Sequence, residues 1–89
     1  MPASHGPACE PFLLRALREV ERGEIVTTTR TSPMRHRSED LPSRLSSALF
    51  VLRRDGMIAL AASRDPLDGW ITVELTEFGR TSLRSWVSA

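Results

Sequence analysis

The side chains of this sequence with the clearest chemical potential are arginines and small hydroxyls in its middle part. Between residues 27 and 64 the chain carries seven arginines and three acidic residues, hence a net charge of +4, whereas the whole chain carries only +1. Guanidinium groups donate paired hydrogen bonds to phosphates and to guanine. All twelve basic residues are Arg, which a GC-rich coding genome explains more simply than function does. The charge asymmetry nevertheless indicates that an anionic partner would bind this middle part.

The sequence lacks the combinations of residues that catalysis and metal binding need. Two distant histidines, His5 and His36, and the single Cys9 do not make a metal site. One cysteine also excludes a disulfide within the chain. Ser46 and Ser47 have no candidate His and acid partners for nucleophilic catalysis. We therefore expect no enzyme activity, no metal and no cofactor in this chain of 89 residues, which is too short for a large cleft.

The first part of the chain predicts a helix, a strand and a short second helix. Pro11 is tolerated in the first turn of the helix, and Gly23 can end it. The β-branched residues within 24–30 predict a short strand or an extended connector. A serine and a proline are suited to start a short helix over 33–38, where Met34 is the only apolar anchor. One side of the first helix is apolar and consists of Phe12, Leu13, Ala16, Leu17 and Val20.

The helix with the strongest pattern follows at about residues 41–54. Asp40 can cap its start, and Gly56 lies just past its end. Its apolar stripe is formed by Leu41, Leu45, Ala48, Leu49 and Leu52. The side chains opposite this stripe are Ser43, Ser47, Phe50 and Arg54, with Arg44, Ser46 and Val51 on the flanks. Such hydroxyls and arginines suit close approach to a groove bordered by phosphates, although a solvated face is the alternative.

A change of hydrophobic period near the end of the chain predicts a strand that runs directly into a helix. Two strands flank residues 64–69, where Asp65 and Asp68 favour a turn, so a β-hairpin is expected. Thr76 can cap the final helix. Gly79 lies in the first turn of that helix, where a glycine permits close approach to the rest of the domain.

Residues 41–83 resemble the winged helix-turn-helix of small bacterial transcription regulators, particularly the MarR, PadR and ArsR-like groups. The matching residues are Leu49, Leu52, Gly56, Met57 and Ile58 at the end of the helix, then Leu75, Thr76, Gly79 and Arg80 after the hairpin. The resemblance implies an α+β fold with a three-helix core, a β-hairpin wing and a C-terminal helix. Residues 27–40 depart from the pattern, because they lack the apolar signature of the helix that precedes the recognition helix.

The resemblance also implies sequence-specific binding of double-stranded DNA by a bacterial transcriptional regulator, which would be cytoplasmic and associated with the nucleoid. The helix at 41–54 would enter the major groove, and Arg64 at the tip of the wing would reach the backbone or the minor groove. The residues expected to face the major groove are Ser43, Arg44, Ser46, Ser47 and Arg54. The residues expected to hold phosphates are Arg30, Arg35, Arg37 and Arg53.

Two other functions stay open at this point. Phe50 and Val51 could form a surface for a protein partner, although a phenylalanine on this face could also contact the methyl group of a thymine. A pocket beside Trp70 or Trp86 could take a small-molecule effector, although a chain this short leaves little room for a separate effector domain.

One winged-helix domain is expected at 11–89, preceded by a flexible lead-in at 1–10. No apolar run approaches the length of about 18 residues that a membrane span needs, so no membrane partner is expected. The first and last helices carry more apolar surface than so small a domain must bury, which predicts a homodimer on a near-palindromic site. The side chains of this expected dimer surface are Phe12, Leu13, Leu17, Val20, Leu83, Trp86 and Val87.

Overall fold

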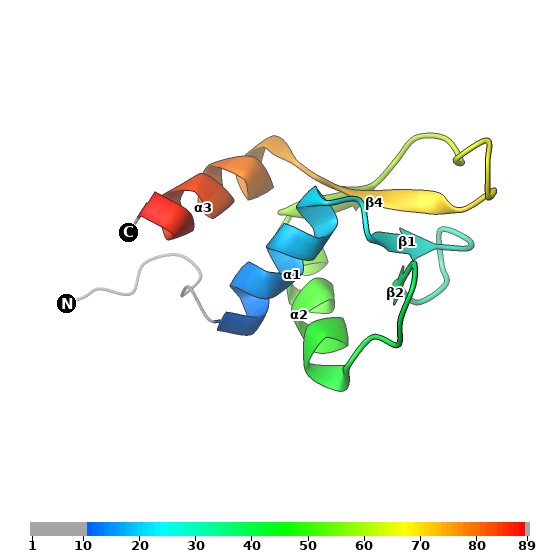
Figure 1. Ribbon diagram of the computed structural model, residues 1–89. Helices are drawn as coiled ribbons and strands as arrows, with labels where there is room; N and C mark the ends of the chain where they lie inside the picture. Colours follow the sequence, from blue (N-terminus) through cyan, green and yellow to red (C-terminus); the bar gives the residue numbers. More distant parts are fainter. Residues whose placement is uncertain (1–10, 89) are drawn as a thin grey trace.

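The computed structural model describes residues 11–88 as three helices and one four-stranded antiparallel sheet (Figure 1). The elements are α1 (Pro11–Glu21), β1 (Ile25–Thr27), β2 (Arg35–His36), α2 (Ser43–Arg54), β3 (Ile58–Leu60), β4 (Ile71–Leu75) and α3 (Glu77–Ser88). The α+β class predicted from the sequence is confirmed. None of the three helices is both long and apolar enough to cross a membrane. The lead-in expected at 1–10 lies outside the described residues.

The helix α1 forms because its apolar residues recur on one face. The buried side chains of that face are Leu13, Ala16, Leu17 and Val20. Gly23 ends the helix with a φ of +77°, a conformation that glycine adopts without a steric penalty. Its N–H donates to the carbonyl of Val20 at 3.0 Å, and the N–H of Glu24 donates to the carbonyl of Glu19 at 3.1 Å. These two bonds are the usual glycine-ended helix cap, so the predicted end is confirmed.

The short helix predicted at 33–38 is wrong, because this segment contributes the strand β2 instead. β2 pairs antiparallel with β1, and Ile25 lies opposite His36. The buried ring of His36 also reaches α1, with its Nε2 atom 3.1 Å from Oε1 of Glu19. A helix here would have only one apolar side chain to bury, and so short a helix is not stable without packing. Pairing with β1 gives backbone N–H and C=O groups of this segment hydrogen-bond partners, whereas so short a helix would leave most of these groups without partners.

The helix α2 begins later than the sequence pattern suggested. Its N-cap residue is Pro42, with a φ of −60° and a ψ of 149°, and no side chain caps the helix there. The predicted cap by Asp40 is therefore wrong, because a residue directly before a proline, here Leu41, is kept out of the helical conformation. The predicted apolar stripe is buried at Leu45, Ala48, Leu49 and Leu52, whereas Leu41 precedes the helix and is half-buried. Gly56 ends the helix with a φ of +79°, which confirms the predicted end.

The strands β3 and β4 form the predicted hairpin. β4 pairs with β1 on its other side, so the order of strands in the sheet is β2-β1-β4-β3. In Figure 1 the helices gather at one end of the molecule, and the hairpin loop lies at the other. Asp65 accepts a hydrogen bond from the N–H of Leu67 at 2.7 Å, and Asp68 accepts one from the N–H of Trp70 at 2.8 Å. Both aspartates therefore build the turn, as predicted.

The junction between β4 and α3 explains the glycine in the first turn of the last helix. Thr76 Oγ1 accepts the N–H of Gly79 at 3.0 Å and donates to the carbonyl of Gly56 at 2.6 Å. The N–H of Thr76 donates to the carbonyl of Met57 at 3.0 Å. A Cβ atom on Gly79 would lie only 2.0 Å from that carbonyl oxygen. The predicted cap by Thr76 and the close approach at Gly79 are both confirmed.

The helix α1 contacts α2, α3 and β4, and these neighbours cover most of its apolar side. Four side chains of the expected dimer surface are consequently buried within the monomer, namely Leu13, Leu17, Val20 and Leu83. Trp86 is half-buried and packs against the core. Phe12 and Val87 remain, at 36% and 52% exposed. The excess apolar surface on which the homodimer prediction was based is therefore mostly used inside one chain.

Candidate nucleic-acid interface

The polar face of α2 is open to solvent over its whole length. Seven side chains form this face and all are exposed: Ser43, Arg44, Ser46, Ser47, Phe50, Arg53 and Arg54. Val51 is half-buried, packs against the core and belongs to the edge of the face. The sequence of α2 contains no acidic residue. The face therefore combines three hydroxyls, three guanidinium groups and one aromatic ring, and its charge is entirely positive.

The three arginines of α2 make only loose contacts within the protein. The guanidinium of Arg44 lies 5.3 Å from the centroid of the Phe12 ring on α1. Arg54 Nε donates to Asp55 Oδ1 at 3.3 Å, and the Arg54 side chain is 63% exposed, so this ion pair contributes little to stability. The side chain of Arg53 has no hydrogen-bond or ion-pair partner within residues 11–88. All three side chains keep N–H donors available for an external acceptor.

Two of the arginines predicted to contact DNA join the hairpin loop to the loop between β1 and β2. Arg30 Nη2 donates to the carbonyl oxygens of residues 61–62, at 3.0 Å in each case. Arg64 Nη1 donates in the opposite direction to the carbonyl of Thr28 at 2.7 Å, and within its own loop to the carbonyl of Gly69 at 2.9 Å. Each arginine uses one terminal nitrogen in these bonds. The remaining N–H groups of both side chains can still reach an anion.

Arg37 is more completely engaged than any other arginine of the predicted site. Its Nε donates to the carbonyl of Gly23 at 2.7 Å, its Nη2 to Thr72 Oγ1 at 3.1 Å, and its Nη1 to the Asp68 carboxylate. The pKa of Asp68 is lowered from its usual range, first by the backbone N–H of Trp70 and then by this guanidinium. Arg37 thus ties β2 to the turn after α1, to β4 and to the hairpin loop.

Arg35 completes this set, since its guanidinium lies 5.5 Å from the centroid of the Trp70 ring. We refer to Arg30, Arg35, Arg37 and Arg64 together as the hairpin clamp. All four were predicted from the sequence as DNA contacts, and all four have partners on the hairpin or beside it. The sequence analysis missed Trp70 and the backbone carbonyls as these partners. It also missed Phe12 as the neighbour of Arg44.

A groove of about 620 Å³ lies between α2 and the loop that joins β1 to β2. The residues that line it are Ser46, Phe50, Arg53 and Arg54 from α2, and Thr31, Ser32, Pro33 and Met34 from the loop. Phe50 is 66% exposed at this groove. The loop side of the groove was not predicted, because the sequence analysis placed residues 33–38 in a helix.

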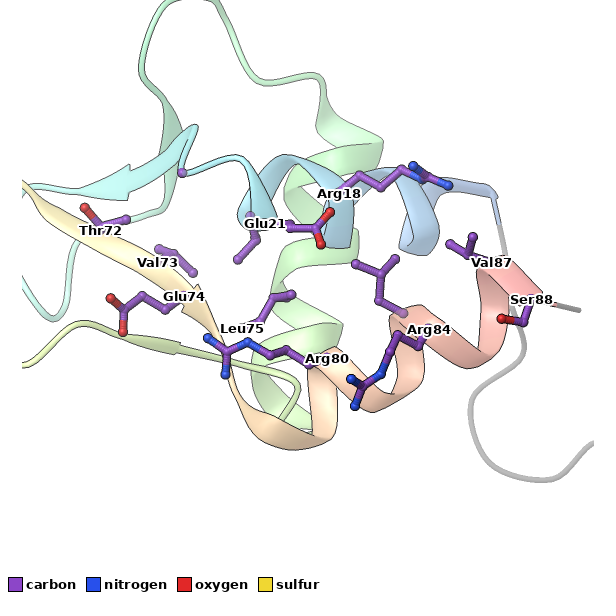
Figure 2. A pocket seen from close by; sticks show the side chains of 13 residues that line it. Arg18, Glu21, Thr72, Val73, Glu74, Leu75, Arg80, Arg84, Val87 and Ser88 are labelled. Carbon is purple, nitrogen blue, oxygen red and sulfur yellow. The ribbon is translucent and has the colours of Figure 1, made fainter.

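A second hollow, of about 660 Å³, lies between α1, β4 and α3 (Figure 2). The charged side chains around it are Arg18, Glu21, Glu74, Arg80 and Arg84, so both signs of charge are present. In Figure 2 two of the guanidinium groups project from α3 and the third from α1, on the other side of the hollow. Neither hollow is lined by Trp70 or Trp86, the two residues of the alternative effector pocket.

The features that bear on function are thus the acid-free face of α2, the groove beside it and the hairpin clamp. Six of the ten predicted site residues lie on α2, namely the five expected to face the major groove and Arg53. The other four form the hairpin clamp. No protein-family model, curated protein or solved structure was found to match the chain.

Proposed function

We propose that the protein binds double-stranded DNA by placing the polar face of α2 in the major groove. The observation that carries this proposal is that α2 presents three arginines and three serines to solvent and contains no acidic residue. Guanidinium groups bind phosphates and the edge of guanine, and serine hydroxyls are small enough for the helix to approach the bases closely. A helix face that is only solvated usually mixes both signs of charge.

The fold that suits this proposal is a winged helix in which β2 stands in place of the helix before the recognition helix. The buried stripe of α2 packs against α1, which fixes the direction in which the polar face points. The β3–β4 hairpin follows α2 directly, as a wing would, and β1 extends its sheet. Sequence-specific binding by such a domain would suit a transcriptional regulator.

The hairpin clamp divides into residues that we assign to DNA and one that we do not. Arg30, Arg35 and Arg64 are exposed and keep free N–H groups, so we assign them to phosphates near the wing. Arg37 is half-buried and donates from all three of its nitrogen atoms, so we assign it to holding the hairpin. A wing that is held before binding loses less conformational entropy when it meets the duplex.

The experiment that tests the proposal is selection of binding sites from random duplexes, followed by titration of the selected site and of a random duplex. Arg54→Ala is expected to weaken binding to the selected site by about 1–3 kcal/mol and to the random duplex by less. Arg84→Ala removes the same charge from α3 and serves as the control. If the purified, folded protein binds no duplex even at low salt, the proposal is wrong.

A protein-interaction surface is the second candidate function, and the exposure of Phe50 favours it. An aromatic ring surrounded by arginines is a common centre of protein interfaces. In that case Phe50→Ala would abolish capture of a protein partner, and neither Arg53→Ala nor Arg54→Ala would change any affinity for DNA. The duplex titration therefore separates the two candidates.

A further inference from the structure

Phe50 lies in the middle of the polar face of α2, and the core does not require it there. Its side chain is 66% exposed, although every other large apolar residue of α2 is buried or half-buried. Ser46 and Ser47 lie one turn before it, and Arg53 and Arg54 lie one turn after it. The ring is therefore placed between the hydroxyls and the guanidinium groups that we assign to DNA.

The groove beside α2 gives this ring an apolar partner surface. Phe50 lines one side of the groove, and Pro33 and Met34 of the facing loop line the other. Met34 also packs against the core, which holds the loop in place. Thr27 fixes the same loop from within, because its buried Oγ1 lies 2.7 Å and 3.1 Å from two loop carbonyls. The groove is consequently an apolar strip bordered by positive charge.

We propose that Phe50 contacts the 5-methyl group of a thymine and so selects a T·A pair within the binding site. This inference rests on the proposed function. Thymine is the one standard base that presents a methyl group in the major groove, and apolar side chains are the usual contacts of that group. The arginines beside the ring complement the phosphates around such a base, whereas they would stay unpaired against an apolar protein surface.

The position of Phe50 on α2 also sets the distance to the next base that is read. A helix rises about 1.5 Å per residue, so four residues from Phe50 to Arg54 span about 6 Å. Base pairs are about 3.4 Å apart along the duplex. An arginine at position 54 that reads guanine would therefore do so about two base pairs from the thymine. Selected sites are expected to share a T and a G at this separation.

The test replaces thymine by uracil, one position at a time, in the selected duplex. This change removes the methyl group and leaves every hydrogen-bonding atom of the base in place. One such replacement is expected to weaken binding of the wild-type protein by about fourfold, the value for burial of one methyl group. The same replacement is expected to have no effect on the Phe50→Ala variant. Phe78→Ala, which removes another half-exposed ring from α3, serves as the control and is expected to keep the full uracil effect.

Each outcome of this test has a distinct meaning. A uracil effect at one position that disappears only in Phe50→Ala supports the contact. Tight duplex binding with no uracil effect at any position overturns the inference and leaves DNA binding intact. A uracil effect that persists in Phe50→Ala also overturns it, because another side chain then contacts the methyl group. If no duplex is bound at all, the proposed function fails and the inference fails with it.

Discussion

Replacement of Gly79 by alanine is the most direct test of how the hairpin and the last helix are joined. Alanine is favoured over glycine in a helix by about 1 kcal/mol, so an open site would gain stability. Here the new Cβ would lie 2.0 Å from the carbonyl oxygen of Met57, and the two backbones must separate by about 1 Å to reach even 3.0 Å. That separation breaks the 3.0 Å bond from the N–H of Thr76 to Met57 and the 2.6 Å bond from Thr76 Oγ1 to Gly56.

The magnitude follows from these opposing contributions. Loss of the two hydrogen bonds costs about 1 kcal/mol each. Overpacking against a rigid backbone costs about 1–3 kcal/mol more, and the better helix propensity returns about 1 kcal/mol. The Gly79→Ala variant is therefore expected to be less stable by about 2–4 kcal/mol. Since each kcal/mol lowers the Tm of a domain of this size by about 4–8 °C, the shift is large enough to measure by circular dichroism.

Urea unfolding at fixed pH and temperature gives the free energy of unfolding for each variant. Ser85→Ala, at an exposed position of the same helix, is expected to be neutral or slightly stabilising. Gly56→Ala serves as a comparison in which backbone strain acts without a steric clash. Gly56 has a φ of +79°, but a Cβ added there would meet no other atom within 4 Å. The left-handed backbone alone is therefore expected to cost about 1–2 kcal/mol. If Gly79→Ala is as stable as the wild type, the close packing of α3 against Met57 is refuted.

Three further predictions concern the clamp and the state of assembly. Arg64→Ala is expected to make log affinity less steep against log salt by up to about one unit, because one phosphate contact is lost, and an unchanged slope would remove Arg64 from the interface. The lowered pKa of Asp68 stabilises the fold above the unfolded pKa of about 3.9 and ceases to do so as the pH falls through the lower folded value. The Tm of the wild type should therefore drop more steeply in this acid range than that of Asp68→Asn, and parallel curves would contradict the contacts of the Asp68 carboxylate with the Trp70 N–H and with Arg37. Because the apolar side of α1 is mostly buried and Leu83 of α3 is buried as well, we expect a sedimentation mass near 9.9 kDa without DNA, and twice that mass would support the dimer.

The parts of the fold that follow from local sequence could be predicted, and the part that depends on a distant partner could not. α1 and α2 have periodic apolar stripes and end at glycines, so the sequence predicts which of their faces are buried and where their C-terminal ends lie. Thr76 and Gly79 marked the last junction for the same reason. β2 carries no such signal, because a two-residue strand is defined by pairing with β1 and not by its own pattern. At 33–38 the capping residues alone suggested a helix, and the prediction was wrong because no apolar stripe accompanied them.

The candidate site divides in the same way. The exposed face of α2 follows from helical periodicity alone, so its members could be identified as a set. The contacts of the clamp could not, because three of the four carbonyls to which Arg30 and Arg64 donate lie 31–36 residues away, and every residue type has a carbonyl. Arg37 was indistinguishable in sequence from its neighbours, and only the positions of Asp65 and Asp68 beside it show that its charge is paired.

The choice of hydrogen-bond acceptors lets the clamp stiffen the hairpin and keep the positive charge that the proposed DNA binding requires. Arg30 and Arg64 bond to neutral carbonyl oxygens, so each fixes a loop without losing its positive charge. Arg35 lies over a neutral aromatic ring and likewise keeps its charge. Arg37, whose partners include the Asp68 carboxylate, is the clamp residue with a paired charge. Three of the four arginines thus contribute rigidity and positive potential at once, and a duplex that meets the hairpin would find both already in place.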